Sequence, residues 1–391
     1  MKNKRTDKLE HQFDSSKGST LKRKSGWLGS PKIIPYIGYG DSNNTFIMGE
    51  VVRSFAVTKP AEHFSRWQNI LATVKRYLVE DVADFDVTVE YNGMSKTVRT
   101  DKFGIFRCEF NHSGKMISAE RWQKAIINLT INENNRYYYP DINSGKVESE
   151  VMVVNNKSQF GVISDIDDTI IVSYATQKLT KLKLLLFNNA HTRMPFEGVS
   201  AFYTALQQGT SDDITNPVFY LSNSEWNLYD LLYEFIEFNR IPKGPLLLRE
   251  MKIRLLNPLK LMVVKKNHKQ QVLYQLFSTL TELKFILIGD SGQHDPEVYA
   301  EIVRQFPGRV LAIYIRDVGI PEHAAEIKTI SQKIQDEFSV EMILVKDTEA
   351  AAKHAISKGF ISPEYLKPII KEKEKDQQAS DTINPGSTLQ G

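Results

Sequence analysis

The feature that most constrains this chain is an alternation of segment types that begins near Gln159. From there on, short apolar runs that suit buried strands alternate with longer runs whose apolar residues recur at helical spacing. Strands that alternate with helices build parallel sheets, because each parallel pair needs a crossover that a helix usually supplies. We therefore predict an α/β domain, with a parallel sheet covered by helices on both faces. The predicted strands are 160–164, 218–221, 285–288, 310–315 and 342–345, and the predicted helices lie near 178–188, 198–208, 225–239, 268–280, 296–306, 321–337 and 348–357.

The preceding part of the chain, residues 32–156, is rich in short β-type runs. The clearest is VTVEY-NG-MSKTV, in which Asn92-Gly93 stands between two alternating strands and favours the tight turn of a hairpin. Residues 101–104 predict the next turn. The segment 62–80 differs, because its apolar residues recur at helical spacing and predict one helix. We expect an antiparallel β-sandwich with strands at 45–52, 86–91, 96–100, 105–110, 125–132 and 147–154.

The two ends of the chain carry few residues that could form a core. Residues 1–32 hold nine Lys or Arg and three acidic residues, so their net charge is +6 against −3 for the rest of the chain. We predict a disordered basic arm at 1–31, an α/β domain at 157–370 and a disordered tail at 371–391. Pro385 is the only proline in this tail, so we expect no SH3-binding segment there. Contact of the arm with an anionic membrane is an alternative, and no nucleic-acid partner is expected.

Composition narrows the class of protein and its compartment. With 41% hydrophobic and 25% charged residues the chain resembles ordinary globular proteins, and no apolar run reaches the roughly 18–20 residues that span a bilayer. Cys108 is the only cysteine, which excludes an intrachain disulfide and a cysteine metal cluster. The first thirty residues lack the apolar core of a secretory signal. We expect a cytoplasmic protein, with peripheral membrane contact as an alternative.

Polar side chains follow three of the predicted strands at the point where each strand ends. They are Asp165, Asp167, Asp168 and Thr169 after the first strand, Ser222 after the second, and Asp290 and Asp295 after the third. In an open parallel sheet, ligands collect at the carboxyl ends of the strands, so these side chains are expected to share one crevice. Taken alone, the Asp-rich turn and Ser222 are more simply helix caps, and Gly289-Asp290 is an ordinary strand exit. Their occurrence together in one domain favours a functional site.

The predicted crevice would hold four aspartates, which repel one another unless a cation lies among them. They are Asp165, Asp167, Asp290 and Asp295. The candidate ligands are oxygen atoms, and His268 and His294 are interpreted as isolated turn residues, so Mg²⁺ fits better than zinc. Magnesium usually keeps several waters and meets the phosphate of a substrate. The crevice therefore points to phosphoryl transfer, with a carboxylate available as the nucleophile.

The order of these motifs along the chain resembles a known superfamily. DxDxT, then a strand-end Ser, then a Lys, then GDxxxxD is the order found in the haloacid dehalogenase superfamily of aspartate-nucleophile phosphatases. The strings GVISDIDDTI, FYLSNSEWNLYDLL, FILIGDSGQHDPEVY and AIYIRDV resemble the catalytic domain of the actin-patch-protein type of phosphatidate phosphatase. The resemblance is strong over about 159–320 and weaker before it. It implies a haloacid-dehalogenase-like Rossmannoid fold and a magnesium-dependent phosphatase that converts phosphatidate to diacylglycerol and phosphate through an aspartyl-phosphate.

The resemblance also implies roles for the acidic residues. Asp165 resembles the nucleophile, and Asp167 resembles the general acid that protonates the leaving group and then activates water. The magnesium ligands would be Asp165, the backbone carbonyl of Asp167, and Asp290. Asp295 would orient water or the catalytic lysine from behind the ligands, and Thr169 would brace the nucleophile loop.

Two further catalytic positions follow from the same resemblance. Ser222 resembles the hydroxyl that hydrogen-bonds a phosphoryl oxygen. Lys269 resembles the lysine that pairs with the nucleophile and the phosphoryl charge, with Lys265 and Lys266 as alternatives close by in the sequence. Both residues would therefore bind phosphate as well as take part in catalysis.

Other interpretations stay open at this point. Arg249 and Arg316 could bind a second anionic group of a substrate or form structural ion pairs. The segment 177–188 could cap the site, lie on a lipid surface or belong to the core. The enzymatic alternatives are phosphatases of a soluble phosphometabolite or a phosphoprotein, and the non-enzymatic one is an interaction scaffold. A receiver domain fits poorly, because its acidic residues and lysine follow a different order along the chain.

Overall fold

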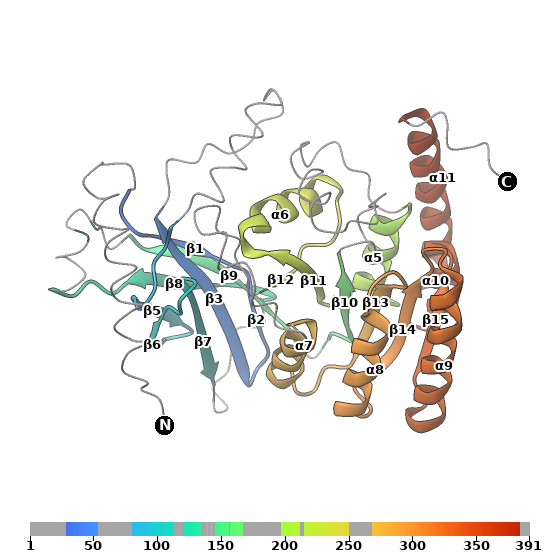
Figure 1. Cartoon of the computed structure of the whole chain (residues 1–391), viewed down its shortest axis with the longest axis horizontal. Helices are drawn as coiled ribbons and strands as arrows, with labels where there is room; N and C mark the ends of the chain where they lie inside the picture. The colour runs from blue at the N-terminus through green and yellow to red at the C-terminus, as the bar shows by residue number, and fades with distance from the viewer. Residues whose placement is uncertain are drawn as a thin grey trace.

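The computed structural model describes residues 29–53, 80–112, 120–133, 139, 142, 145–155, 157–166, 197–211, 215–249 and 268–383. Several predicted features lie outside the described residues: the basic arm up to residue 28, residues 62–79 of the predicted helix 62–80, the predicted helix 178–188, and Asp167, Asp168, Thr169, Lys265 and Lys266. Residue 80, the last of the predicted helix 62–80, lies in a short strand instead. Within them, the chain forms an N-terminal β-rich part and a C-terminal α/β part (Figure 1).

Within the described residues, the C-terminal part is built on a parallel sheet, as predicted, with six strands where five were expected. Its strands are β10 (Gly161–Asp165), β11 (Val218–Glu225), β12 (Leu246–Arg249), β13 (Phe285–Asp290), β14 (Val310–Arg316) and β15 (Glu341–Val345). Their order across the sheet is β12-β11-β10-β13-β14-β15, and every neighbouring pair is parallel. In chain order this is third, second, first, fourth, fifth, sixth, which is the doubly wound arrangement. The strand order reverses between β10 and β13, where such sheets bind ligands.

Helices connect and cover these strands. They are α5 (Val199–Gln208), α6 (Tyr229–Phe238) after the short helix η2 (Trp226–Leu228), α7 (His268–Thr279), α8 (Asp295–Gln305), α9 (Pro321–Phe338), α10 (Thr348–Ser357), the short helix η4 (Pro363–Tyr365), and α11 (Leu366–Ile383). The helices α7, α8 and α9 pack in sequence on one another, and α5, α10 and α11 form a second group. Right-handed crossovers in a sheet of this order place the two groups on opposite faces.

The C-terminal helix corrects one prediction. The segment 371–391 was expected to be disordered, yet α11 continues as a helix to Ile383. Its carboxylates reach the amino end of α5, where Oδ2 of Asp376 accepts from Gly198 N at 3.0 Å and Oε2 of Glu372 accepts from Ala201 N at 2.6 Å. Ile369 anchors the start of this helix in the core, and beyond residue 370 these contacts to α5 are polar, which explains why the sequence pattern suggested disorder there.

The described residues of the N-terminal part form nine strands. They are β1 (Lys32–Pro35), β2 (Gly38–Gly40), β3 (Asn44–Arg53), β4 (Glu80–Asp81), β5 (Asp86–Tyr91), β6 (Met94–Arg99), β7 (Ile105–Asn111), β8 (Trp122–Leu129) and β9 (Val147–Val153). All pairs are antiparallel except β2 with β9. The long strand β3 pairs with β1, β2, β4 and β7. The strands therefore form one connected and largely antiparallel sheet.

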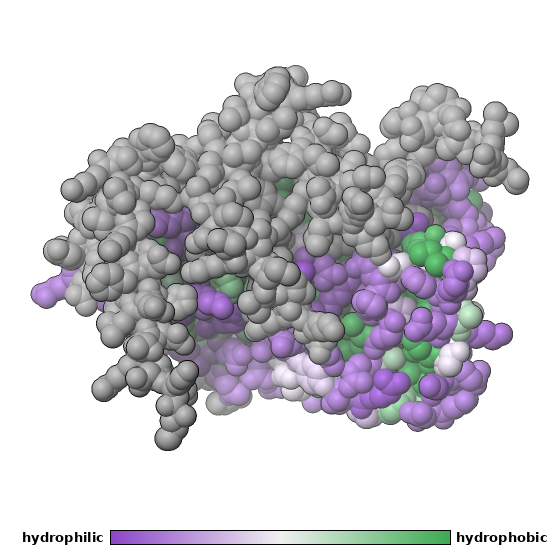
Figure 2. Space-filling view, viewed as in Figure 1, coloured by the Kyte–Doolittle hydropathy of each residue, from purple (hydrophilic) through white to green (hydrophobic). Residues whose placement is uncertain are grey.

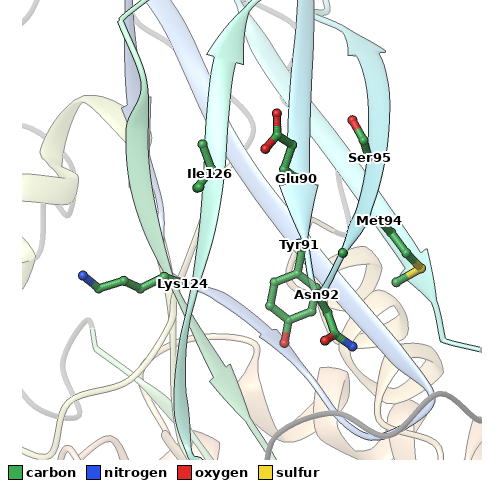
Figure 3. A pocket seen from close by; sticks show the side chains of 8 residues that line it. Glu90, Tyr91, Asn92, Met94, Ser95, Lys124 and Ile126 are labelled. Carbon is green, nitrogen blue, oxygen red and sulfur yellow. The ribbon is translucent and has the colours of Figure 1, made fainter.

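Two predicted turns of this sheet are confirmed. Asn92 and Gly93 have φ angles of 48° and 71°, and Tyr91 pairs with Met94 across them, as a two-residue hairpin requires. In the next turn, Gly104 N donates to the Asp101 carbonyl at 2.9 Å. A shallow hollow of about 310 Å³ lies beside the hairpin, between its turn and β8 (Figure 3). It belongs to the N-terminal sheet and is not lined by residues of the parallel strands.

One hydrophobic cluster spans the two parts, while the N-terminal sheet also has a second cluster of its own. The Tyr36 ring, just after β1, stacks on Trp226 with ring centroids 4.2 Å apart and lies 4.6 Å from the ring of Tyr229. The backbone N–H of Ile37 donates to the Tyr229 hydroxyl at 3.1 Å. Charged contacts surround these rings, including Lys243 Nζ at 2.6 Å from Glu150 Oε2. The N-terminal sheet is thus packed directly against the chain that follows β11.

The outer surface can be followed in Figure 2. On the face shown there, the described surface is mostly hydrophilic, with smaller apolar areas over the C-terminal part. Within the residues that the structure describes, no helix is both long and apolar enough to cross a membrane.

Candidate active site

The site is built around a carboxylate at the end of β10. Asp165 is the last residue of this strand, and its side chain is fully buried because β11 and β13 flank it. A buried carboxylate needs a partner to offset the loss of water. Lys269, the second residue of α7, supplies one: its Nζ lies 2.7 Å from Asp165 Oδ1.

The same lysine binds a second buried carboxylate. Lys269 Nζ lies 2.5 Å from Oδ1 of Asp295, at the start of α8. The other oxygen of Asp295 accepts from the backbone N–H of Asp290 at 3.3 Å. This packing requires glycine at position 289, since a Cβ there would lie 2.6 Å from Asp295 Oδ2. Lys269 therefore bridges Asp165 and Asp295 near the carboxyl ends of β10 and β13.

Burial and charge act in opposite directions on Lys269. Burial alone would lower the pKa of its ammonium, but the attraction and hydrogen bonds of Asp165 and Asp295 outweigh it and raise the pKa above the ordinary lysine value. Lys269 is therefore a permanent positive charge beside Asp165 at neutral pH.

A third carboxylate completes the group. Asp290 ends β13, the strand next to β10, and its Oδ1 accepts from Gly292 N at 2.6 Å. One carboxylate oxygen from each of Asp165, Asp290 and Asp295 lies within 4.8 Å of the others, and all three side chains are buried. Against three carboxylates, Lys269 contributes one positive charge, so the described group keeps a net charge of −2.

This donor set fits a hard divalent cation. The three residues offer only carboxylate oxygens, and neither His268 nor His294 belongs to the group. Oxygen donors and a net negative charge suit Mg²⁺, which uses one or two carboxylates and completes its shell with water. Because Asp295 already binds Lys269 and the Asp290 backbone, Asp165 and Asp290 are the carboxylates better placed to hold the cation.

Ser222 lies inside β11 rather than after it. The strand runs to Glu225, four residues beyond its predicted end, and its pairing with β12 shifts register between Leu221 and Glu225. Leu221 is the register partner of Asp165, so Ser222 follows directly on the neighbouring strand. Its side chain is buried, and its Oγ accepts from Ser224 N at 2.9 Å.

The two arginines considered from the sequence lie at strand ends. Arg316 is the register partner of Asp290 and ends β14, beside the acidic group. Arg249 ends β12 and pairs in register with Glu225 on β11. Of the three lysines considered, Lys269 is the one within the described residues, and it contacts Asp165 directly.

Sequence reasoning missed two polar residues of the site. Gln293 Nε2 donates to Asp290 Oδ2 at 3.0 Å and to Asp165 Oδ2 at 3.4 Å. Its Oε1 accepts from Asn223 Nδ2 at 3.0 Å. Both residues lie next to motif residues, Gln293 within GDSGQHD and Asn223 directly after Ser222, so their position in the sequence was the available signal.

The fold and the site together define a class. This is a doubly wound α/β domain whose buried acidic group, bridged by a lysine, lies where the strand order reverses. Residues 160–317 match the family described as Phosphatidate phosphatase APP1, catalytic domain. The matched segment is less than half of the chain, and it contains every site residue described above.

Individual relatives agree with this family. The chain is 28% identical over 311 residues to Phosphatidate phosphatase APP1 of Saccharomyces cerevisiae, which covers 78% of this chain and 50% of the relative. It is 27% identical over 285 residues to an uncharacterized protein of Schizosaccharomyces pombe, covering 70% and 43% respectively. The chain thus spans about half the length of these curated relatives or less.

Solved structures resemble the chain only distantly. A carbohydrate acetylesterase from Xanthomonas citri is 11% identical, covers 91% of this chain and 76% of that chain, and gives a TM-score of 0.28. A score of this size does not indicate a shared fold.

Proposed function

We propose that this protein is a magnesium-dependent phosphatase with a haloacid-dehalogenase-like catalytic domain, and that it hydrolyses phosphatidate to diacylglycerol and phosphate. The observation that carries the proposal is the pairing of Asp165 with Lys269 in a segment of the APP1 catalytic family. A phosphatidate phosphatase is a phosphoric monoester hydrolase, so the family match supports the reaction class, and the burial of Asp165 beside Lys269 supports Asp165 as the nucleophile.

The chemistry begins with Asp165. Its carboxylate would attack phosphorus, forming an aspartyl-phosphate as the bond from phosphorus to the lipid oxygen breaks. By the family resemblance, Asp167 would give a proton to the departing oxygen and then take one from the water that hydrolyses the aspartyl-phosphate. Phosphate would leave, and Asp165 would return to its free carboxylate.

Other side chains would stabilise the charge that moves during this reaction. Lys269 would keep Asp165 ionised and oppose the negative charge of the phosphoryl oxygens, while Ser222 would donate a hydrogen bond to one of them. Asp165, Asp290 and the carbonyl of Asp167 would hold Mg²⁺. When bound, the cation would neutralise the phosphoryl group and orient it towards Asp165.

A phosphate-release assay tests this proposal. The purified full chain would be assayed with phosphatidate in mixed vesicles, with lysophosphatidate, with sugar phosphates and with phosphopeptides, in Mg²⁺ or in EDTA. We expect release from phosphatidate that EDTA abolishes and that Asp165→Asn reduces by about a thousandfold or more. The matched control is Asp336→Asn on the exposed surface of α9, which should leave the rate unchanged.

Four outcomes would contradict the proposal. Activity that survives Asp165→Asn would exclude Asp165 as the nucleophile, and activity that survives EDTA would exclude the cation. Release from sugar phosphates or phosphopeptides in preference to phosphatidate would replace the lipid by a soluble substrate. The absence of release from all four substrates would instead favour an interaction scaffold.

We also propose that the protein is cytoplasmic and that its basic arm touches anionic membranes. The support for the membrane contact is the net charge of +6 in residues 1–32. Each lysine or arginine near an anionic lipid surface contributes about 1 kcal/mol of binding free energy. Deleting residues 1–30 should weaken co-sedimentation with vesicles that contain phosphatidylserine, while neutral vesicles serve as the control. Equal binding of the full and shortened chains would overturn this proposal.

A further inference from the structure

We infer that Gln293 is a positioning residue whose side-chain amide competes with a divalent cation for the Oδ2 atoms of Asp165 and Asp290. The inference rests on the proposed function, in which these two carboxylates hold the cation. It assigns a role to a neutral side chain in the loop between β13 and α8, which the mechanism above does not use.

The contacts of the two carboxylates carry the first step. Oδ1 of Asp165 binds Lys269 at 2.7 Å, and Oδ1 of Asp290 accepts from the backbone of Gly292 at 2.6 Å. Their Oδ2 atoms share one donor, Gln293 Nε2, at 3.4 Å and 3.0 Å respectively. Gln293 therefore joins the two carboxylates that the proposed function assigns to the cation, through oxygens other than those that contact Lys269 and Gly292.

The chemistry of these oxygens carries the second step. An N–H donor and a cation both bind through oxygen lone pairs, and the positive end of the N–H dipole is repelled by a cation. A neutral amide stabilises two buried carboxylates less than a double positive charge does. A cation that bound both Oδ2 atoms would therefore displace Nε2, whereas Lys269 could keep its contact with Oδ1 of Asp165.

The other end of the same side chain carries the third step. Gln293 Oε1 accepts from Asn223 Nδ2 at 3.0 Å, and Asn223 directly follows Ser222 on β11. Displacing the Gln293 amide would therefore disturb the hydrogen bond that joins the acidic group to the proposed phosphate-binding strand. Gln293 links cation binding at β10 and β13 to the conformation of β11.

Manganese binding in the absence of substrate tests the competition. Isothermal titration of the full chain with Mn²⁺ alone would give the dissociation constants of the wild type, Gln293→Ala and Gln293→Leu. We expect both variants to bind Mn²⁺ about tenfold more tightly, because a hydrogen bond to a charged group no longer has to be broken. The control is His294→Ala, whose side chain is 93% exposed and which should match the wild type.

The outcomes separate three roles of Gln293. Unchanged Mn²⁺ affinity in both variants would overturn the competition, and weaker affinity would show that Gln293 is itself a ligand. Gln293→Leu keeps the bulk of the side chain, so it decides the question if the alanine variant does not fold. Thermal unfolding in EDTA would show which variants are folded, and we expect Gln293→Ala to unfold at a lower temperature than His294→Ala.

A double variant tests the link to β11. If Asn223 acts through Gln293, the variant carrying both Asn223→Ala and Gln293→Ala should bind Mn²⁺ as tightly as Gln293→Ala alone. Additive effects would overturn the link. These measurements are independent of turnover: a wild type that binds Mn²⁺ but releases no phosphate would defeat the proposed function, while the ratio of dissociation constants would still decide this inference. A wild type that binds no Mn²⁺ would overturn the inference itself.

Discussion

Lys269 Nζ lies 2.7 Å from Asp165 Oδ1, and only 7% of the lysine side chain and none of the aspartate side chain is exposed. Burying two charges is costly, and the pair is retained because each partner offsets the desolvation of the other. Removing one partner leaves the other charge buried without compensation. The pair therefore matters for stability as well as for chemistry.

Replacing the lysine should reveal both effects. We expect Lys269→Met to lower the free energy of unfolding by about 3–5 kcal/mol, because Asp165 and Asp295 would remain buried without their cationic partner. Urea unfolding would measure this loss, and the phosphate-release assay would show loss of turnover. The exposed Lys284→Met is the control. A loss below about 1 kcal/mol would place the pair among weak surface interactions.

The pH dependence of this contribution follows from its sign. The pKa of Lys269 is raised in the folded protein, so its stabilising effect is complete below the ordinary lysine pKa and is lost only as the pH rises through the higher folded value. The difference in stability between wild type and Lys269→Met should therefore be the same at about pH 6 and about pH 9. A difference that shrinks over this interval would mean that Lys269 titrates there.

The single cysteine offers a probe of the N-terminal sheet. Burial raises the pKa of the Cys108 thiol to about 11, so the thiol is neutral and enclosed at neutral pH. We expect no reaction with an aromatic disulfide reagent in the native protein, and one equivalent of reaction after unfolding in urea. Rapid labelling of the native protein would show that the core of this sheet opens locally.

The helix α11 should stabilise the amino end of α5. Glu372 and Asp376 accept hydrogen bonds from Ala201 N and Gly198 N, where α5 has no side-chain cap of its own. We expect Glu372→Ala and Asp376→Ala each to lower the free energy of unfolding by about 1 kcal/mol, as other lost caps do. Glu374→Ala, on the exposed side of the same helix, is the control. Equal stability of all three variants would contradict this capping role.

The shared core should make the two sheets unfold together. Tyr36→Ala removes the ring that stacks on Trp226 at 4.2 Å, and we expect it to lower the free energy of unfolding by about 3–5 kcal/mol within a single transition. Turnover should also fall, because Trp226 lies just beyond Ser222 along the chain. Tyr36→Phe keeps the ring and is the control. Two separate transitions in calorimetry would argue against a shared core.

The parallel sheet could be predicted because its signals are local. Each buried strand is a short apolar run, and Asp165 and Asp290 stand where such runs end, so the doubly wound topology alone brings them together. Lys269 could be placed near them only through the family resemblance, because no local pattern shows that α7 meets β10. The short strand β12 was not predicted. It has only four residues, and the sequence after it has no clear pattern, so its hydrophobic periodicity is too short to recognise.

The remaining errors arise where contacts are distant in sequence. The tail was expected to be disordered because its stabilising contacts are hydrogen bonds to α5, which composition does not reveal. Ser222 was placed after its strand because polarity suggested an exit, whereas β12 extends the pairing to Glu225. Gln293 was overlooked because a neutral amide gives no charge signal, although it contacts two catalytic candidates.

The reversal of strand order has a consequence for how this protein reaches its native state. Asp165 and Asp290 are neighbours only because β13 returns across the sheet to pair with β10, after β11 and β12 have been added on the other side. Closing such a long loop costs chain entropy before the contacts that stabilise it can form. Non-local strand pairing therefore slows folding. Secondary structure should therefore return early during refolding, and the acidic group should assemble only when the first and fourth parallel strands have met.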